Sequence, residues 1–198
     1  LLVYRRGNEK FLVVVNAAND EKDWSWLTGV KEGTYCVDND VPWSVAFGRN
    51  VLLHNLRDPQ AGGEMRVDIA LQGPNSRKIL LNLGATEKDR QAILGLKWAQ
   101  LCEATLNGIH LIISRTGYTG ERMGFELFVH PDKAVALWEA LLEAGDLLGI
   151  KPCGLGARDS LRTEAGLPLY GHEMGGMLNL GVGEAGFGSF VKAYKPWF

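Results

Sequence analysis

Residues that bind metals or form disulfides are scarce in this sequence. The three cysteines, Cys36, Cys102 and Cys153, lie far apart and form no C-x-x-C pair. This usage favours a reduced, intracellular protein over a disulfide-stabilised scaffold. The four histidines show no metal-ligand spacing, either with one another or with the cysteines, so we expect no metal site.

The sequence also lacks an excess of charge and a long hydrophobic run. Lys and Arg number 21 against 23 Asp and Glu, and the net charge of −2 leaves no domain-wide basic field to hold a nucleic acid. No apolar run approaches the ~20 residues of a membrane-spanning helix, so we expect no membrane partner. With 198 residues, 46% hydrophobic and 22% charged, the composition is that of a soluble globular protein of one or two domains.

An initial methionine and a signal peptide are missing as well. The chain opens on "LLVYRR", which has the pattern of a strand interior, and closes on "KPWF". We expect the sequence to be a piece of a longer protein, with further parts before Leu1 and after Phe198.

The sequence contains a series of predicted strand pairs. Two apolar runs, 1–6 and 11–16, flank the turn residues "GNEK" and predict a β-hairpin. Asn107-Gly108, between 98–106 and 109–117, is the strongest short hairpin signal in the chain. Further strands are predicted at 65–73 and 125–130 and, within the irregular stretch 31–65, at 50–56. The last thirty residues have the pattern of glycine-punctuated strand or loop, with "FGSFV" strand-like.

Capping residues and apolar periodicity predict helices at 19–27, 75–83, 86–96, 131–149 and 154–166. The clearest of them, 131–149, is predicted to carry its apolar face on Val135, Trp138, Leu141 and Leu142. Strand pairs interspersed with helices indicate an α+β fold with mostly antiparallel sheets.

The stretch "GYTGERMGFELFVH", Gly117 to His130, joins a glycine-rich turn carrying Tyr118 to a strand. Alternation directs Phe125, Leu127 and Val129 to one face and Glu126 to the other. Most acids in such positions lie on the solvent side of a sheet, which is the simpler interpretation of Glu126. The neighbouring aromatic rings leave a second interpretation open, in which Glu126 contacts a flat ligand.

Two further polar residues allow two interpretations each. Arg158, at the start of a predicted helix in "GLGARD", forms either an ion pair with Asp159 or Glu164 or a planar contact to a carboxylate or polar ring. Asn16 ends an apolar strand and is either a turn or cap residue or an amide that contacts the edge of a ligand.

Familiar catalytic motifs are absent or accidental. "GVGEAG", 181–186, matches G-x-G-x-x-G, but a dinucleotide site needs this motif between a strand and a helix, and no helix is predicted after it. Nothing resembles a P-loop or a Ser-His-Asp triad, because neither Ser114 nor Ser160 has a histidine at motif spacing.

Five blocks, spread over nearly the whole chain, resemble one family when taken in order: "FLVVVNAANDEKDWSWL", "ALQGPNS", "RTGYTGERMGFEL", "KPCGLGARDSLRTEAGLPLYGHEM" and "GEAGFGSFVKAYKPWF". This is the aminomethyltransferase family, to which the T-protein of the glycine cleavage system belongs. The resemblance implies that residues 1–198 are its folate-binding region, built from two intertwined α+β subdomains. The N-terminal segment and the C-terminal barrel domain would lie outside the chain.

The resemblance also implies a function and a site. Family members bind tetrahydrofolate, take an aminomethyl group from the lipoyl arm of a carrier protein, and form methylenetetrahydrofolate and ammonia. Matched motif by motif, the resemblance makes Glu126 the acid that binds the edge of the pterin, and Asn16 lies beside the pterin. Tyr4 and Tyr118 line the cavity, and Arg158 lies at the folate site.

Two departures from the family pattern bear on function. The family's catalytic aspartate lies immediately before the strand that begins at Leu1, so the chain as given is expected to be inactive. The segment "GERMGFE" is one residue longer than usual, and 31–65 also looks extended. A tetrahydrofolate-dependent methyltransferase or demethylase with another one-carbon donor, and a non-catalytic folate-binding protein, therefore stay open as alternatives. The expected compartment is a bacterial cytoplasm or a mitochondrial matrix.

Overall fold

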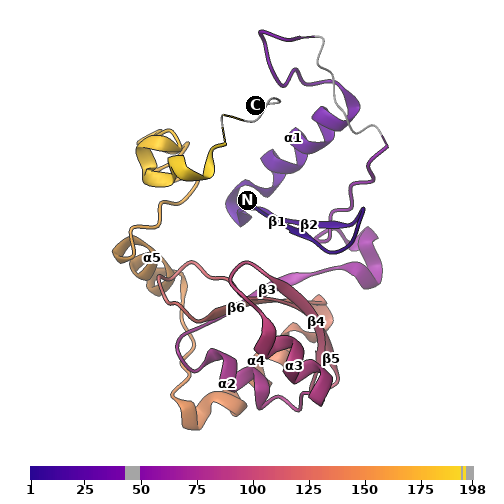
Figure 1. The fold of residues 1–198 in the computed structure, drawn as a ribbon, viewed down its shortest axis with the longest axis vertical. Helices are drawn as coiled ribbons and strands as arrows, with labels where there is room; N and C mark the ends of the chain where they lie inside the picture. The colour runs from indigo at the N-terminus through magenta and orange to yellow at the C-terminus, as the bar shows by residue number, and fades with distance from the viewer. Residues whose placement is uncertain (43–49, 193, 195–198) are drawn as a thin grey trace. The chain divides into compact units, whose positions relative to one another are not determined.

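The computed structural model describes residues 1–42, 50–192 and 194, and the chain forms two compact units. Unit 1 comprises Leu1–Val3, Lys10–Leu53 and Leu167–Phe198, and unit 2 comprises Tyr4–Glu9 and His54–Gly166. Helices and antiparallel sheets make up the structure, which confirms the predicted α+β class (Figure 1). Within the described residues, none of the helices has the length and apolar character needed to cross a membrane.

Unit 2 is built on a four-stranded antiparallel sheet with the strand order β3-β6-β5-β4. These strands are β3 (Val67–Gln72), β4 (Leu101–Leu106), β5 (Ile109–Ser114) and β6 (Gly124–Val129). The predicted hairpin at Asn107-Gly108 is confirmed: the φ angles of these residues are 49° and 72°, as a tight two-residue turn requires.

Helices cover one face of this sheet (Figure 1). The helices of unit 2 are α2 (Ser76–Leu81), α3 (Glu87–Gly95), α4 (Pro131–Gly145) and α5 (Leu155–Glu164), with the 3₁₀ turns η2 (Pro59–Glu64) and η3 (Asp146–Leu148). The side chain of Thr86 caps α3 by accepting the Asp89 N–H at 3.2 Å. The helix positions confirm those predicted from the sequence.

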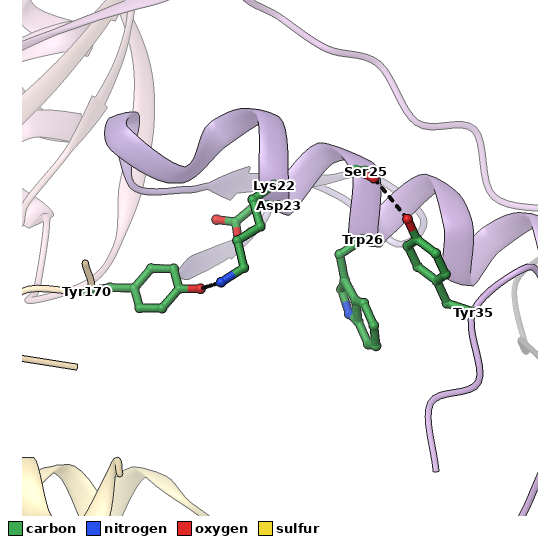
Figure 2. Close-up of a pocket in the computed structure, with 6 residues that line it drawn as sticks. All are labelled: Lys22, Asp23, Ser25, Trp26, Tyr35 and Tyr170. Carbon is green, nitrogen blue, oxygen red and sulfur yellow. Dashed lines mark hydrogen bonds between the residues drawn. The ribbon is translucent and has the colours of Figure 1, made fainter. Parts of the chain in front are cut away.

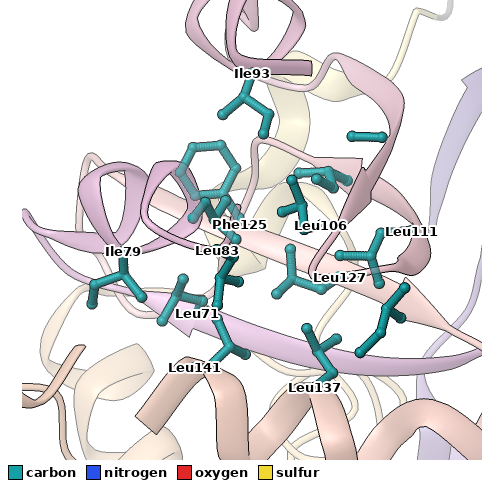
Figure 3. Close-up of a cluster of buried hydrophobic side chains, with 14 of the residues drawn as sticks. Leu71, Ile79, Leu83, Ile93, Leu106, Leu111, Phe125, Leu127, Leu137 and Leu141 are labelled. Atoms are coloured by element: carbon teal, nitrogen blue, oxygen red, sulfur yellow. The ribbon is translucent and has the colours of Figure 1, made fainter. Parts of the chain in front are cut away.

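The core of unit 2 lies between the sheet and the helices α2, α3 and α4. Strand alternation supplies Leu71, Leu111, Phe125 and Leu127 from the sheet, as the pattern of 125–130 predicts. The helices contribute Ile79, Ile93, Leu137 and Leu141, which point toward the same cluster (Figure 3).

The predicted apolar face of α4 is wrong at Val135 and Trp138 and confirmed at Leu141. Val135 is 69% exposed and Trp138 is 41% exposed, whereas Leu137 and Leu141 are buried against the sheet. This helix carries apolar residues around most of its circumference, so periodicity alone does not select the buried side. Leu137, Leu141 and Gly145, spaced four residues apart, form the row that fits against the strands.

Unit 1 contains the helix α1 (Asp20–Glu32), preceded by the 3₁₀ turn η1 (Ala17–Asn19). Three acids in the first turn of α1 favour its N-terminus, and Gly33, with a φ of 74°, ends it in the left-handed conformation. The predicted hairpin at the start of the chain is confirmed as the two-stranded sheet of β1 (Leu2–Arg5) and β2 (Phe11–Val14).

Two predicted strands are not observed. Residues 50–56 pair with no strand in the described part of the chain, and Val51 and Leu52 are exposed, so the run has no buried face to hold it extended. The strand-like segment near the C-terminus instead forms the turns η4 (Gly183–Phe187) and η5 (Gly188–Phe190). Local bonds such as Phe187 N to Val182 O, at 2.9 Å, satisfy its backbone.

The packing of α4 generates a prediction for stability. Leu137→Ala should lower the free energy of unfolding by about 2–5 kcal/mol, because it leaves a cavity against the sheet. Val135→Ala, on the exposed side of the same helix, should change it by less than about 0.5 kcal/mol. Urea unfolding followed by circular dichroism measures both variants. Equal losses would contradict this assignment of the buried face.

Candidate functional site

Glu126 lies in the middle of β6, on the sheet face opposite the core. Ala70 on β3 and Ser114 on β5 are its register partners. The side chain is half-buried, and its Oε2 atom is buried without a hydrogen-bond partner among the described residues. Burial and, second, the charge of Asp68 raise the pKa of Glu126 to about 7. The simpler sequence interpretation, an ordinary solvent-side acid, is therefore wrong.

Asp68 is a second acid on this face, and sequence reasoning missed it. It lies opposite Phe128, while Ala70, two residues on, lies opposite Glu126, so the two acids are diagonal neighbours. Burial of its carboxyl raises the pKa of Asp68 to about 6, and a hydrogen bond from the backbone N–H of Leu127 opposes the rise. The alternation of "VDIALQ" was the available signal, since it directs Asp68 away from Leu71 and the core.

Tyr4 and Ser114 form a buried polar pair beside Glu126. Tyr4 is 5% exposed, and its hydroxyl accepts a hydrogen bond of 2.6 Å from the Ser114 Oγ. Burial raises the pKa of Tyr4, and the charge of Glu126 raises it further, while the bond from Ser114 opposes the change. The Tyr4 hydroxyl therefore stays protonated near the carboxyl of Glu126.

The side chain of Gln72 holds the turn that precedes β6. Its Nε2 donates to the carbonyl oxygens of Thr116, at 3.3 Å, and Phe125, at 3.2 Å. Its Oε1 accepts from the Thr119 hydroxyl at 3.2 Å. One amide thus joins β3 to both ends of the "GYTGERMG" turn.

Two glycines make room for this amide. A Cβ atom would lie 1.8 Å from the Gln72 Oε1 if built on Gly117, and 2.2 Å from it if built on Gly124. Neither position accepts a side chain without displacing Gln72.

Arg158 and Tyr118 are brought together in unit 2. The guanidinium carbon of Arg158 lies 5.6 Å from the centre of the Tyr118 ring, within the range of a cation–π contact. Asp159, the first partner suggested by the ion-pair interpretation, instead pairs with the buried Arg162 at 2.7 Å. The planar interpretation of Arg158 thus has a geometric basis in its contact with an aromatic ring.

Asn16 belongs to unit 1, where it is the residue that begins η1. Its carbonyl accepts the Asn19 N–H at 3.0 Å, but its side chain forms no capping hydrogen bond. The backbone of Asn16 therefore acts as a helix cap, as one of the two interpretations predicts. Its half-buried side-chain amide takes no part in capping.

Unit 1 also contains a pocket of about 410 Å³ on α1, which the sequence did not indicate (Figure 2). The rings of Trp26 and Tyr35 stack with their centres 5.5 Å apart. The Lys22 Nζ donates to the Tyr170 hydroxyl at 2.5 Å, which raises the pKa of Lys22. In the residues that the structure describes, no cluster of His, Cys, Asp and Glu could hold a metal ion.

The fold defines an α+β domain with a half-buried acid on the free face of an antiparallel sheet. The chain matches the family model described as the GCVT N-terminal domain over residues 1–195, and it belongs to this family. The resemblance stated from the sequence blocks is confirmed.

Relatives and a solved structure agree with this family. The chain is 42% identical over 195 residues to the aminomethyltransferase of Alkaliphilus metalliredigens, covering 98% of this chain and 45% of that protein. It is 43% identical over 198 residues to the aminomethyltransferase of Halothermothrix orenii, covering 100% and 47%. The crystal structure of the glycine cleavage system aminomethyltransferase T from Bartonella henselae matches with a TM-score of 0.57 and 30% identity, over 87% of this chain and 38% of that one. The chain thus spans under half the length of these relatives.

The buried acid predicts a pH dependence of stability. Because the pKa of Glu126 rises from 4.5 to about 7 on folding, the folded state keeps a proton that the unfolded chain has lost between these values. Stability contributed by this proton is present below pH 4.5 and is gone above pH 7. From pH 4.5 to 7, Glu126→Gln should therefore gain stability over wild type by on the order of 3 kcal/mol. Urea unfolding across this range measures the difference, and a constant difference would refute it.

The packing of Gln72 predicts the effect of a single methyl group. Gly124→Ala should lower the free energy of unfolding by about 1–3 kcal/mol, because Gln72 must swing away and lose its hydrogen bonds. Gly95→Ala, where a Cβ meets nothing, should be neutral or slightly stabilising.

A double-mutant cycle tests whether Gln72 is the cause. In a Gln72→Ala background the cost of Gly124→Ala should largely disappear. An undiminished cost would show that the glycine is needed for another reason. Chemical denaturation of the four proteins supplies the data.

Proposed function

We propose that this chain is the folate-binding region of a tetrahydrofolate-dependent aminomethyltransferase of the glycine cleavage type. The observation that carries the proposal is the buried, unpaired carboxyl oxygen of Glu126 on the free face of the sheet. A buried acceptor without a partner is costly, and a ligand that donates to it removes the cost. Relatives at about 42% identity that are named aminomethyltransferase support the reaction class.

The pterin of tetrahydrofolate has the matching chemistry. One edge of this ring presents a ring N–H and an amino group side by side. A single carboxylate accepts both, and bonds to a charged acceptor are the strong ones. We assign this contact to Glu126.

The other predicted residues would hold the rest of the ligand. Tyr118, with Arg158 against its ring, offers a flat, positively charged surface that suits a conjugated ring or a carboxylate. The Tyr4 hydroxyl adds a donor beside Glu126.

The complete reaction requires parts beyond these residues. The proposed partner is a lipoyl-carrier protein, whose aminomethyl group passes to tetrahydrofolate to give methylenetetrahydrofolate and ammonia. The proton-transferring aspartate is proposed to precede Leu1 in the full-length protein. The role of the residues described here is to bind and orient the folate.

Calorimetry of tetrahydrofolate binding tests Glu126. At pH 8, where Glu126 is ionised, Glu126→Gln should weaken binding by about 10- to 100-fold, because it removes the charge and turns a donor toward ligand donors. Glu139→Gln, on the exposed surface of α4, is the matched control and should bind as wild type. The measurement uses the full-length protein as its gene encodes it. Equal affinities for wild type and Glu126→Gln would remove Glu126 from the site.

An activity assay separates the proposed reaction from its alternatives. The full-length protein should turn over an aminomethyl group carried on a lipoyl protein. Turnover only on a methylated small molecule would favour a related methyltransferase or demethylase. Folate binding with no turnover on either donor would favour a non-catalytic protein.

A further inference from the structure

Glu126 lies beside a second carboxyl group on its sheet face, and no cation of the described residues pairs with its Oε2. β3 contributes Asp68, β5 contributes Ser114, and β1 contributes Tyr4, whose hydroxyl bonds to Ser114. Of these neighbours only Asp68 carries a charge at neutral pH, and it has the same sign as that of Glu126.

The charge of Arg6, which lies along this face, is already paired. Arg6 forms an ion pair with Glu103 on β4, and the Nε2 of His110 lies 3.3 Å from the other oxygen of the same carboxyl. In the described part of the chain, Glu103 thus takes the neutralising charge, while the Oε2 of Glu126 has no partner at all.

Two neighbouring acids without a cation do not ionise independently. The first ionisation places a charge on one carboxyl and disfavours the second, so the pair holds one proton over a range of pH. A ligand that donates two N–H bonds to Glu126 requires the fully ionised carboxylate. Binding must then expel the proton into solvent, with no covalent bond made or broken.

We propose that Asp68 is a second acid of the ligand site, a positioning residue that couples binding of a donor ligand at Glu126 to release of the shared proton. This inference rests on the proposed function, because it takes the donor edge of tetrahydrofolate as the ligand. It adds a residue that acts through the protonation state of Glu126.

The direction of the effect follows from the two acids. Burial, and then the charge of Asp68, raise the pKa of Glu126 to about 7. Below this pH the carboxyl is protonated, and its O–H is a donor that faces the donors of the ligand. Affinity is therefore full above pH 7 and falls as the pH decreases. Removing the charge of Asp68 lowers the pKa of Glu126 and moves this fall to lower pH.

Calorimetry of the full-length protein with tetrahydrofolate, kept anaerobic, tests the coupling. Titrations from pH 5.5 to 8.5 in two buffers of different ionisation enthalpy give both the affinity and the number of protons released. At pH 6.5 wild type should release more than about half a proton per ligand, and Asp68→Asn should release fewer, with its affinity midpoint at lower pH. Glu139→Gln makes the same change in net charge and should leave the midpoint in place. An unchanged midpoint in Asp68→Asn would overturn the proposal.

A ligand-free measurement distinguishes failure of this inference from failure of the proposed function. Carboxyl ¹³C NMR, with the Glu126 signal assigned through Glu126→Gln, should give Glu126 a lower pKa in Asp68→Asn than in wild type. The same pKa in both would refute the role of Asp68, whatever ligand binds. If wild type binds no tetrahydrofolate, the proposed function fails while this titration still tests the pair. Asp68→Ser serves as the second variant if Asp68→Asn does not fold.

Discussion

The structure depends on the pairing of β6 with β3 on one side and β5 on the other. Because side chains alternate along a strand, this single register sends Phe125 and Leu127 into the core and Glu126 onto the opposite face. A slip of one residue would bury the acid among leucines and expose the phenylalanine. The stability of unit 2 and the position of its candidate site are therefore fixed by the same hydrogen bonds, and neither varies without the other.

The turn before β6 is held in place by the hydrogen bonds of one polar side chain. Gln72 ends β3, and its amide bonds to three groups of the turn and of β6. Gly117 and Gly124 are small because this amide occupies the space where a Cβ would lie. The segment "GERMG", which the family resemblance predicts to be one residue longer than usual, lies between these anchors, and both ends of the turn are bonded to Gln72.

Local sequence signals predicted most helices and strands, whereas contacts between segments distant in the chain could not be predicted from the sequence. Asn107-Gly108 and the Thr86 cap act within a few residues, so their geometry follows from residue type alone. The buried side of α4 was mispredicted, because only the sheet decides which apolar row is covered. The sequence pattern suggested that Glu126 is a surface acid and did not single out Asp68. Both have the same cause: the acids lie on strands distant in sequence, and neither strand's sequence determines how the two strands pair. The roles of Tyr4, Asn16, Tyr118 and Arg158 toward a ligand stay predictions.

The hydrogen bond between Tyr4 and Ser114 spans 110 positions of the chain. Tyr4 leaves the ribosome before its partner strand and Glu126, which are made more than a hundred residues later. During synthesis the Tyr4 hydroxyl can bond only to water until β5, which carries Ser114, has been made. Closure of so long a loop is slow compared with formation of the β4–β5 hairpin. We therefore expect the contact of Tyr4 with the acid face of the sheet to form after the β4–β5 hairpin.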